Sequence, residues 1–195
     1  MWSLPLLALL LFTVVAHTTA HPSSIVSNRT LPYPHPVRSP RLAPALMQEL
    51  MGPDGGKRAL KAWNDLYLTE PDRSIPTTTG WPRLRPLIEV AQWSRANGQY
   101  WYIEQINDNE VALKSLTGKY VTHWNLSASS LKFEEAHPSD EAKEWEMLTP
   151  VKNEDGSWSF KSRWDHYLSA HHESKRVNFQ PHNDRCEHWR LEAWY

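Results

Sequence analysis

The chain contains the stretch Leu60-Lys61-Ala62-Trp63-Asn64-Asp65-Leu66-Tyr67-Leu68, and the same pattern returns twice. It returns as LKSLTGKYV over Leu113–Val121 and as FKSRWDHYL over Phe160–Leu168. Each copy opens with a large apolar residue followed by lysine, and each closes with tyrosine followed by an aliphatic residue. Regular return of one pattern indicates a fold built from copies of one unit, so this repeat decides the fold class.

Two further series run in phase with this pattern. Tryptophan recurs every 44 residues, at Trp101, Trp145 and Trp189, and an apolar residue follows each of them two positions later. Alternating segments such as Ile88-Glu89-Val90 recur at 131–133 and 177–179. Such alternation is typical of short, half-buried strands, and turn-forming residues separate the segments. Four short strands in each of three copies predict twelve strands.

Units of four short strands cannot bury their apolar faces separately, so the three copies are expected to share one core. Closing the copies on one another also removes exposed sheet edges. We therefore predict an all-β fold, a β-trefoil of three four-stranded repeats over residues 55–195. A short helix and turn over residues 44–54 is expected to precede it and to end at Gly52-Pro53.

The repeat resembles the fascin-like, or actin-crosslinking-like, β-trefoil repeat over essentially all of residues 55–195. Leu113–Val121 is the closest copy, and Glu187–Glu192 resembles the closing strand of that family. The resemblance implies a binding protein, either an actin bundler or, in the wider trefoil architecture, a lectin. Copies one and three depart from the family's Gly-Lys at the hairpin, with Asn64–Leu66 and Trp164–His166 there. Because Asn and Asp tolerate the left-handed conformation, these hairpins are still expected to form.

Residues at equivalent positions of the three copies are expected to form the core. The predicted core residues are Leu60, Leu113, Phe160, Leu68, Val121, Leu168, Val90, Phe133, Phe179, Trp101, Trp145 and Trp189. The repeated lysines, Lys61, Lys114 and Lys161, alternate outward from that core. We interpret them as solvated residues that protect a strand edge.

The N-terminal region is typical of an exported protein. Leu4–Val15 is almost entirely apolar and too short to span a bilayer. Thr18 and Ala20 offer a small-residue cleavage site, so residues 1–20 are predicted to be a signal peptide. No membrane insertion is expected, and the localisation that follows is secreted and extracellular.

Two features of the predicted mature chain agree with export. Sequons for N-glycosylation occur at Asn28 and Asn125. Residues 21–43 are rich in proline and are predicted to be a disordered, flexible arm, a linker or a propeptide.

Cys186 is the single cysteine, so it cannot form an intrachain disulfide. It is expected either to be buried as a small apolar residue or to pair between chains.

Composition and motifs exclude several classes of function. The formal net charge of −1 argues against nucleic acid as a partner, because nucleic acid needs a concentrated basic face. His171 and His172 would face opposite sides of a strand, and the other histidines lack the spacing of a zinc site. No nucleophile or phosphate-binding motif is present, and a lone trefoil offers no cleft for paired glycosidase carboxylates. We therefore expect no catalytic residue, no metal and no cofactor.

Eleven tryptophans are the most unusual feature of the composition. Trp63, Trp81, Trp124 and Trp164 fall at or beside predicted turns, and we predict that these four bind the ligand. An exposed indole offers a flat apolar face and an N–H donor to a sugar or a protein. Trp81 is favoured because it lies in an insertion that the other copies lack. The alternative role for each indole is packing beneath a loop.

The sequence thus favours a secreted, non-catalytic protein that recognises a glycan or an extracellular protein through trefoil loops. The first alternative is a fascin-like actin-binding or structural protein, against which the predicted export and the near-neutral charge weigh. The second alternative is a secreted glycosidase-like enzyme.

Overall fold

The structure is a computed structural model that describes residues 42–70, 87–94, 97–125, 134–171 and 173–194. In this part of the chain a helix, α1 (Pro44–Met51), precedes twelve strands. The first copy contains β1 (Lys57–Lys61), β2 (Tyr67–Thr69), β3 (Glu89–Ala91) and β4 (Trp101–Gln105). The second contains β5 (Val111–Ser115), β6 (Tyr120–Asn125), β7 (Glu134–Ser139) and β8 (Leu148–Lys152). The third contains β9 (Trp158–Ser162), β10 (Tyr167–Ala170), β11 (Val177–Gln180) and β12 (Arg190–Glu192). Two short 3₁₀ helices, η1 (Asn97–Gln99) and η2 (Arg185–Glu187), precede β4 and β12.

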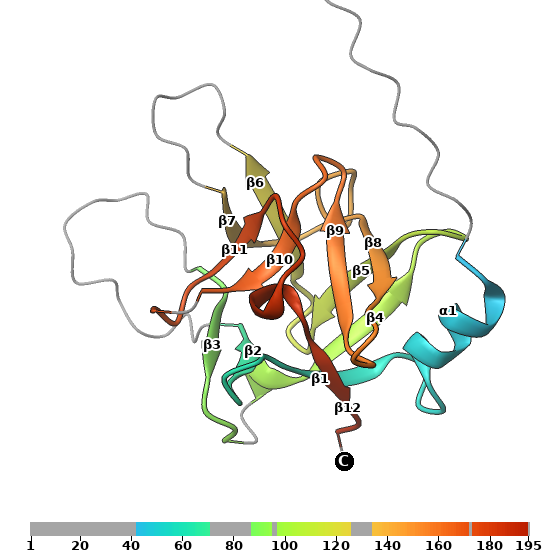
Figure 1. The fold of residues 1–195 in the computed structure, drawn as a ribbon, viewed down its shortest axis with the longest axis horizontal. Helices are drawn as coiled ribbons and strands as arrows, with labels where there is room; N and C mark the ends of the chain where they lie inside the picture. The colour runs from blue at the N-terminus through green and yellow to red at the C-terminus, as the bar shows by residue number, and fades with distance from the viewer. Residues whose placement is uncertain (1–41, 71–86, 95–96, 126–133, 172, 195) are drawn as a thin grey trace, which may run out of the picture. The chain divides into compact units, whose positions relative to one another are not determined.

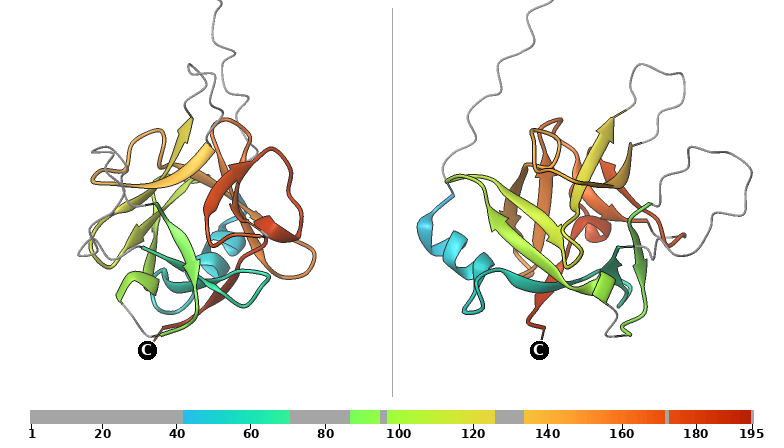
Figure 2. Two further views of the ribbon diagram at one scale, coloured as in Figure 1. Left: turned by 90° about the vertical axis from the view of Figure 1, so that its left-hand side faces the viewer. Right: turned by 180° about the vertical axis from the view of Figure 1, so that it is seen from behind.

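Six of these strands close into a ring. β1 pairs with β4, β4 with β5, β5 with β8, β8 with β9, and β12 with β1. A bridge between Trp158 and Trp189 completes the ring from β9 to the start of β12. The other six strands form three hairpins, β2–β3, β6–β7 and β10–β11, which lie together on one side of the ring (Figure 1). Figure 2 shows the same arrangement from two other sides. The fold is the predicted β-trefoil.

The core confirms most of the predicted core positions. The residues that are at most 1% exposed include Leu60, Leu113, Phe160, Leu68, Val121, Leu168, Val90, Phe179, Trp101 and Trp189. Phe133 lies outside the described residues. Met47 and Leu50 of α1 join the same core, so the helix is held by burial of one face. The helix ends at Gly52, as the sequence indicated, with a positive φ of 57°.

Trp145 corrects the predicted core, because it is 44% exposed. The three copies are aligned by the residue pairs Arg58↔Trp101, Val111↔Leu148 and Trp158↔Trp189. Leu148, which is fully buried, therefore occupies the position of Trp101 and Trp189. The loops before these residues differ in length among the copies, so an equal spacing of tryptophans places Trp145 three residues too early.

The turn between the first and second strands has the same geometry in each copy. In each turn the backbone N–H of one residue donates to the carbonyl oxygen four residues later, with 2.7–2.8 Å between nitrogen and oxygen. The donor–acceptor pairs are Ala62–Leu66, Ser115–Lys119 and Ser162–His166. Asp65 and Asp165 both have a φ of 61°, and the equivalent Gly118 has a φ of 87°. The prediction that aspartate replaces glycine in these hairpins is confirmed.

The repeated lysines are less free than the sequence suggested. Each faces the repeated tyrosine across its hairpin. The distance from the lysine Nζ to the centre of the tyrosine ring is 5.8 Å for Lys61–Tyr67, 5.3 Å for Lys114–Tyr120 and 5.9 Å for Lys161–Tyr167. Each ammonium also meets a carboxylate, at 3.0 Å for Asp65, 3.0 Å for Glu104 and 2.7 Å for Asp165. The lysines therefore contribute to the hairpins, through contacts between a cation and an aromatic ring.

The predicted signal peptide, Asn28 and residues 21–41 of the proline-rich arm lie outside the described residues. At the end of that arm, Leu42 packs against the core, and its N–H donates to Asn109 Oδ1 at 3.0 Å. Among the helices of the described part, none has the length and apolar character needed to cross a membrane. Cys186 is partly buried in η2, and burial raises the pKa of its thiol.

Candidate functional site

The turn of each copy packs against the second strand of the preceding copy, and we call these contacts junctions 1/2, 2/3 and 3/1. The contacts are Thr117 Oγ1 to Glu70 Oε2 at 2.6 Å, Ser162 Oγ to His123 Nδ1 at 2.8 Å, and Trp63 Nε1 to the Ala170 carbonyl at 3.2 Å. Glu70, His123 and Ala170 occupy equivalent positions, two residues after a buried core residue of the second strand. The chemistry of the three junctions therefore differs although their backbone plan is shared.

Junction 2/3 carries a series of aromatic rings from the core to the surface. The ring of His123 lies 4.9 Å from that of Trp164 in a T-shaped arrangement, with an interplanar angle of 85°. Trp164 in turn lies 5.8 Å from Trp145, at 68°. Trp164 is partly buried, whereas Trp145 is exposed. Two indoles from different copies thus meet at the surface, with a histidine beneath them.

Three ion pairs between described residues lie at the rim of this junction. The ion pairs around it are Lys143–Glu141, Arg163–Glu144 and Lys119–Asp140. The guanidinium of Arg163 also lies 5.6 Å from the ring of Trp164. An open hollow of about 780 Å³ is lined by residues 138–147, which include Trp145. The junction therefore joins a flat apolar surface to an open hollow whose lining includes charged side chains.

The three-fold core does not require either indole. The carbonyl of Trp145 accepts the N–H of His123 at 3.1 Å, and the carbonyl of Gly98 accepts the N–H of Glu70 at 2.7 Å, so Trp145 and Gly98 are equivalent. A Cβ at Gly98 would lie 2.4 Å from the Glu70 carbonyl oxygen, so copy one cannot carry a side chain there without a backbone shift. Trp164 likewise replaces Asn64 and Thr117 of the other copies. Residues that the repeat does not demand are candidates for function.

His123 supports this surface from below. It is fully buried, and its ring stacks on Phe179 with centroids 4.1 Å apart and planes 13° apart. Burial, and secondarily the nearby His166, lowers the pKa of His123 to about 3. The imidazole is therefore neutral at physiological pH. Its Nε2 is buried and makes no hydrogen bond to any described residue.

The four tryptophans predicted to bind ligand do not lie at one site. Trp164 belongs to junction 2/3. Trp63 lies in junction 3/1, where its N–H bonds to the Ala170 carbonyl and the Arg185 guanidinium lies 5.0 Å from its ring. Trp63 thus packs between copies three and one, and it does not join Trp164. Trp124 pairs with Glu135 between β6 and β7, next to His123, and Trp81 lies outside the described residues.

Trp145 is a candidate site residue that the sequence did not predict. Its 44-residue spacing from Trp101 and Trp189 placed it in the core. A better alignment uses three buried polar residues, Gln99, Glu146 and Glu187, which lie two positions before Trp101, Leu148 and Trp189. When the three loops are aligned on this Gln/Glu position, Trp145 is equivalent to Gly98 and Cys186 and lies outside the ring.

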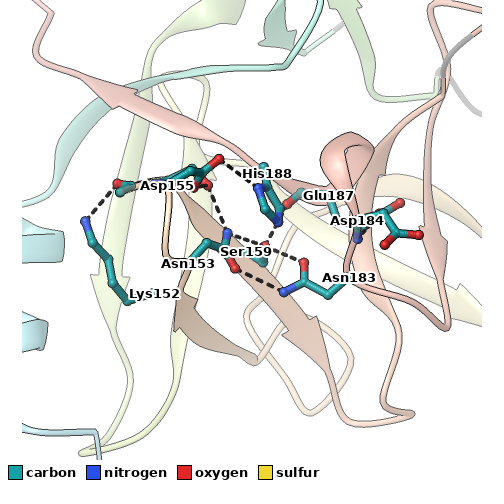
Figure 3. A network of polar contacts seen from close by, with 10 residues as sticks. Lys152, Asn153, Asp155, Ser159, Asn183, Asp184, Glu187 and His188 are labelled. Atoms are coloured by element: carbon teal, nitrogen blue, oxygen red, sulfur yellow. Dashed lines mark hydrogen bonds and ion pairs between the residues drawn. The ribbon is translucent and has the colours of Figure 1, made fainter.

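A second polar cluster lies in copy three and is structural (Figure 3). Asn153 Nδ2 donates to Ser159 Oγ at 2.9 Å, Ser159 Oγ donates to Asn183 Oδ1 at 2.7 Å, and Asn183 Nδ2 donates to Asn153 Oδ1 at 3.0 Å. The three side chains close a ring of hydrogen bonds. Beside them, the Ser157 hydroxyl and then His188 lower the pKa of Asp155, whose Oδ2 is 2.9 Å from His188 Nδ1. This cluster ties the β8–β9 turn to the loop before β12.

Metal chemistry finds no support in the described part of the chain. No group of three histidine, cysteine, aspartate or glutamate side chains there could hold a metal ion. The aromatic and polar groups of junction 2/3 are the candidates on which the proposal below rests.

No protein-family model and no curated protein matches the chain. Solved structures do match it. The designed three-fold symmetric protein ThreeFoil is 16% identical, with a TM-score of 0.56 over 70% of this chain and 97% of that one. SeviL bound to asialo-GM1 saccharide is 12% identical, with a TM-score of 0.55 over 72% and 98%.

An enzyme is also among the similar structures. The GlcNAcα1-4Gal-releasing endo-β-galactosidase of Clostridium perfringens is 12% identical, with a TM-score of 0.53. The match covers 69% of this chain but 31% of the enzyme. At these identities the likenesses show the fold alone, a β-trefoil, and they do not show membership of the fascin-like family.

Proposed function

We propose that this protein binds carbohydrate and that Trp145 and Trp164 form the binding face at junction 2/3. The observation that carries the proposal is the exposure of Trp145, 44%, at a position where the equivalents are Gly98 and Cys186. An exposed indole costs free energy in water, and packing against Trp164 holds it in a fixed orientation. A flat indole face suits the apolar C–H face of a sugar ring.

The surroundings favour a neutral sugar. Arg163 and Lys143 are each paired with a neighbouring carboxylate, which weakens their attraction for a sulfate, phosphate or carboxylate group. The open hollow beside Trp145 provides polar side chains that can bond sugar hydroxyls. SeviL has the same fold and was solved with a saccharide, which supports the proposal by analogy only.

We further propose that the protein is secreted and acts without catalysis, as its N-terminal sequence and motifs predict. Three rival functions are each tested by an assay of their own. An extracellular protein could be the ligand of the same aromatic face. The fascin-like resemblance makes actin binding a second rival, and the resemblance in fold to part of an endo-β-galactosidase makes a glycosidase-like activity the third.

A glycan array with purified wild type, Trp145→Ala and Trp93→Ala tests the proposal. Trp93 is a matched control, because it is also exposed, at 38%, but lies in copy one. We expect wild type and Trp93→Ala to bind the same neutral glycans and Trp145→Ala to lose at least about tenfold in affinity. Equal binding by all three proteins contradicts the assigned site.

Three parallel assays separate the rivals. Absence of binding to every glycan, together with capture of one extracellular protein or co-sedimentation with actin filaments, contradicts the carbohydrate proposal. Release of new reducing ends from a bound glycan would identify an enzyme.

A further inference from the structure

His123 distinguishes junction 2/3 from the other two junctions. Its equivalents are Glu70, which accepts a hydroxyl hydrogen bond, and Ala170, which presents only its backbone. His123 instead fills the junction with a ring that contacts Phe179 on one side and Trp164 on another. The orientation of Trp164 therefore depends on this imidazole.

The surroundings of His123 suit its neutral form alone. The ring makes one hydrogen bond, between Nδ1 and Ser162 Oγ, while Nε2 makes none to a described residue. In either tautomer one ring nitrogen stays unpaired, and a second N–H would add a charge to a fully buried ring.

The neighbouring charged groups give such a charge no obvious partner. His166, in the turn of copy three, lies 5.6 Å away and would repel an imidazolium if it were protonated. Glu146, in the loop that packs on β6, accepts hydrogen bonds from Thr122 Oγ1 and from the Lys143 N–H. Arg163 and Glu144 at the rim pair with each other. His137 lies on the adjacent strand, β7, opposite Thr122.

We infer that His123 positions Trp164 for the ligand and that its protonation in mild acid opens junction 2/3 and releases bound glycan. The glycan part of this inference rests on the proposed function. The control of Trp164 by His123 does not, because it concerns the protein without ligand.

The sign of the effect follows from the buried state of the ring. In the closed junction the pKa of His123 is about 3, whereas an exposed imidazole has an ordinary value of 6.5. Between these values the open junction binds the proton and the closed junction does not. Each unit of pH below the ordinary value therefore favours the open junction by up to about tenfold.

The test uses ¹⁹F NMR of protein labelled with 5-fluorotryptophan, with the Trp164 and Trp101 signals assigned from Trp164→Phe and Trp101→Phe. In wild type without ligand, the Trp164 signal should shift or broaden between pH 7.5 and 4, while the signal of buried Trp101 stays in place. In His123→Gln, the Trp164 signal should be insensitive to pH. His166→Gln is the matched control and should keep the response to acid, with a midpoint moved to slightly higher pH because His166 no longer lowers the pKa of His123.

The ligand arm measures binding of a neutral, galactose-terminated oligosaccharide on beads at pH 7.5 and 4.5. Wild type and His166→Gln should lose at least about tenfold in affinity at the lower pH. His123→Gln should bind more weakly at pH 7.5 and change less than about twofold with pH. Failure of wild type to bind any glycan at either pH contradicts the proposed function and leaves the spectroscopic arm decisive for His123.

Three results overturn the inference. The first is a Trp164 signal that does not respond to acid. The second is a response that His166→Gln removes and His123→Gln keeps. The third is a shift of the Trp101 signal together with the Trp164 signal. If His123→Gln does not fold, Ser162→Ala replaces it. Loss of that hydroxyl removes one contact that closes the junction, so the Trp164 midpoint should move to higher pH. An unmoved midpoint also overturns the inference.

Discussion

Thr122 donates its hydroxyl hydrogen to the buried carboxylate of Glu146, with 2.6 Å between Oγ1 and Oε1. The other oxygen of Glu146 accepts the Lys143 N–H at 2.8 Å, so one side chain joins β6 to the loop before β8. Copy one has the same device in Gln99, whose amide oxygen accepts the Ser94 N–H at 2.9 Å and whose amide nitrogen lies 3.4 Å from Thr69 Oγ1.

Glu187 is the equivalent residue in copy three, but only one of its two carboxylate oxygens accepts a hydrogen bond from a described residue. Its Oε2 accepts the Asp184 N–H at 2.8 Å, while its Oε1 is buried and makes no hydrogen bond to a described residue. The imidazole Nε2 of His182 lies 3.8 Å from this oxygen, on an exposed side chain. Ser169 stands where copies one and two have threonine.

Glu187→Gln is therefore expected to stabilise the protein. Glutamine keeps an oxygen for the Asp184 N–H and supplies an N–H that can reach Ser169, as Gln99 does with Thr69. Removal of an unpaired buried oxygen should raise the free energy of unfolding by about 1 kcal/mol, measured by urea denaturation. Glu146→Gln is the control and should give no gain, because both oxygens of Glu146 already accept hydrogen bonds. Destabilisation by Glu187→Gln would mean that the carboxylate has a partner in the native protein.

A pair of truncations tests the alignment of the three copies. Leu148→Ala removes a fully buried ring residue and should cost about 2–5 kcal/mol of unfolding free energy. Trp145→Ala, three residues earlier, should cost less than about 1 kcal/mol, because Trp145 is 44% exposed and lies outside the ring. Both values come from denaturant unfolding under the same conditions. A larger cost for Trp145 than for Leu148 would restore the equal spacing of tryptophans as the correct alignment.

Trp63 and Trp164 separate packing from binding. Trp63→Phe removes the hydrogen bond to Ala170 and weakens the contact with Arg185, so we expect a loss of about 1–2 kcal/mol in unfolding free energy. Its affinity for the glycan that wild type binds should stay within about twofold. Trp164→Phe should lower that affinity several-fold. The reverse pattern would move the binding face to junction 3/1.

The sequence was sufficient for the fold because the decisive signals are local. Each copy of the hairpin pattern is only nine residues long, and Asp65 and Asp165 by themselves predict the left-handed conformation at their positions. The site was not readable in the same way. Trp145 and Trp164 come from different copies, and their contact depends on loop lengths that a regular spacing ignores. His123 gave no signal, because its burial follows from the packing of β6 against the next copy.

Export is the last prediction, and it decides between extracellular binding and the fascin-like alternative. We expect protein recovered from culture medium to begin near His21 and to carry a glycan on Asn125. Intact-mass and peptide mass spectrometry, before and after enzymatic deglycosylation, measure both. Asn125→Gln is the control and should remove that glycan without changing the new N-terminus. A product that stays in the cell, begins at Met1 and is unmodified would contradict export, and it would make actin the first ligand to test because the protein would share its compartment.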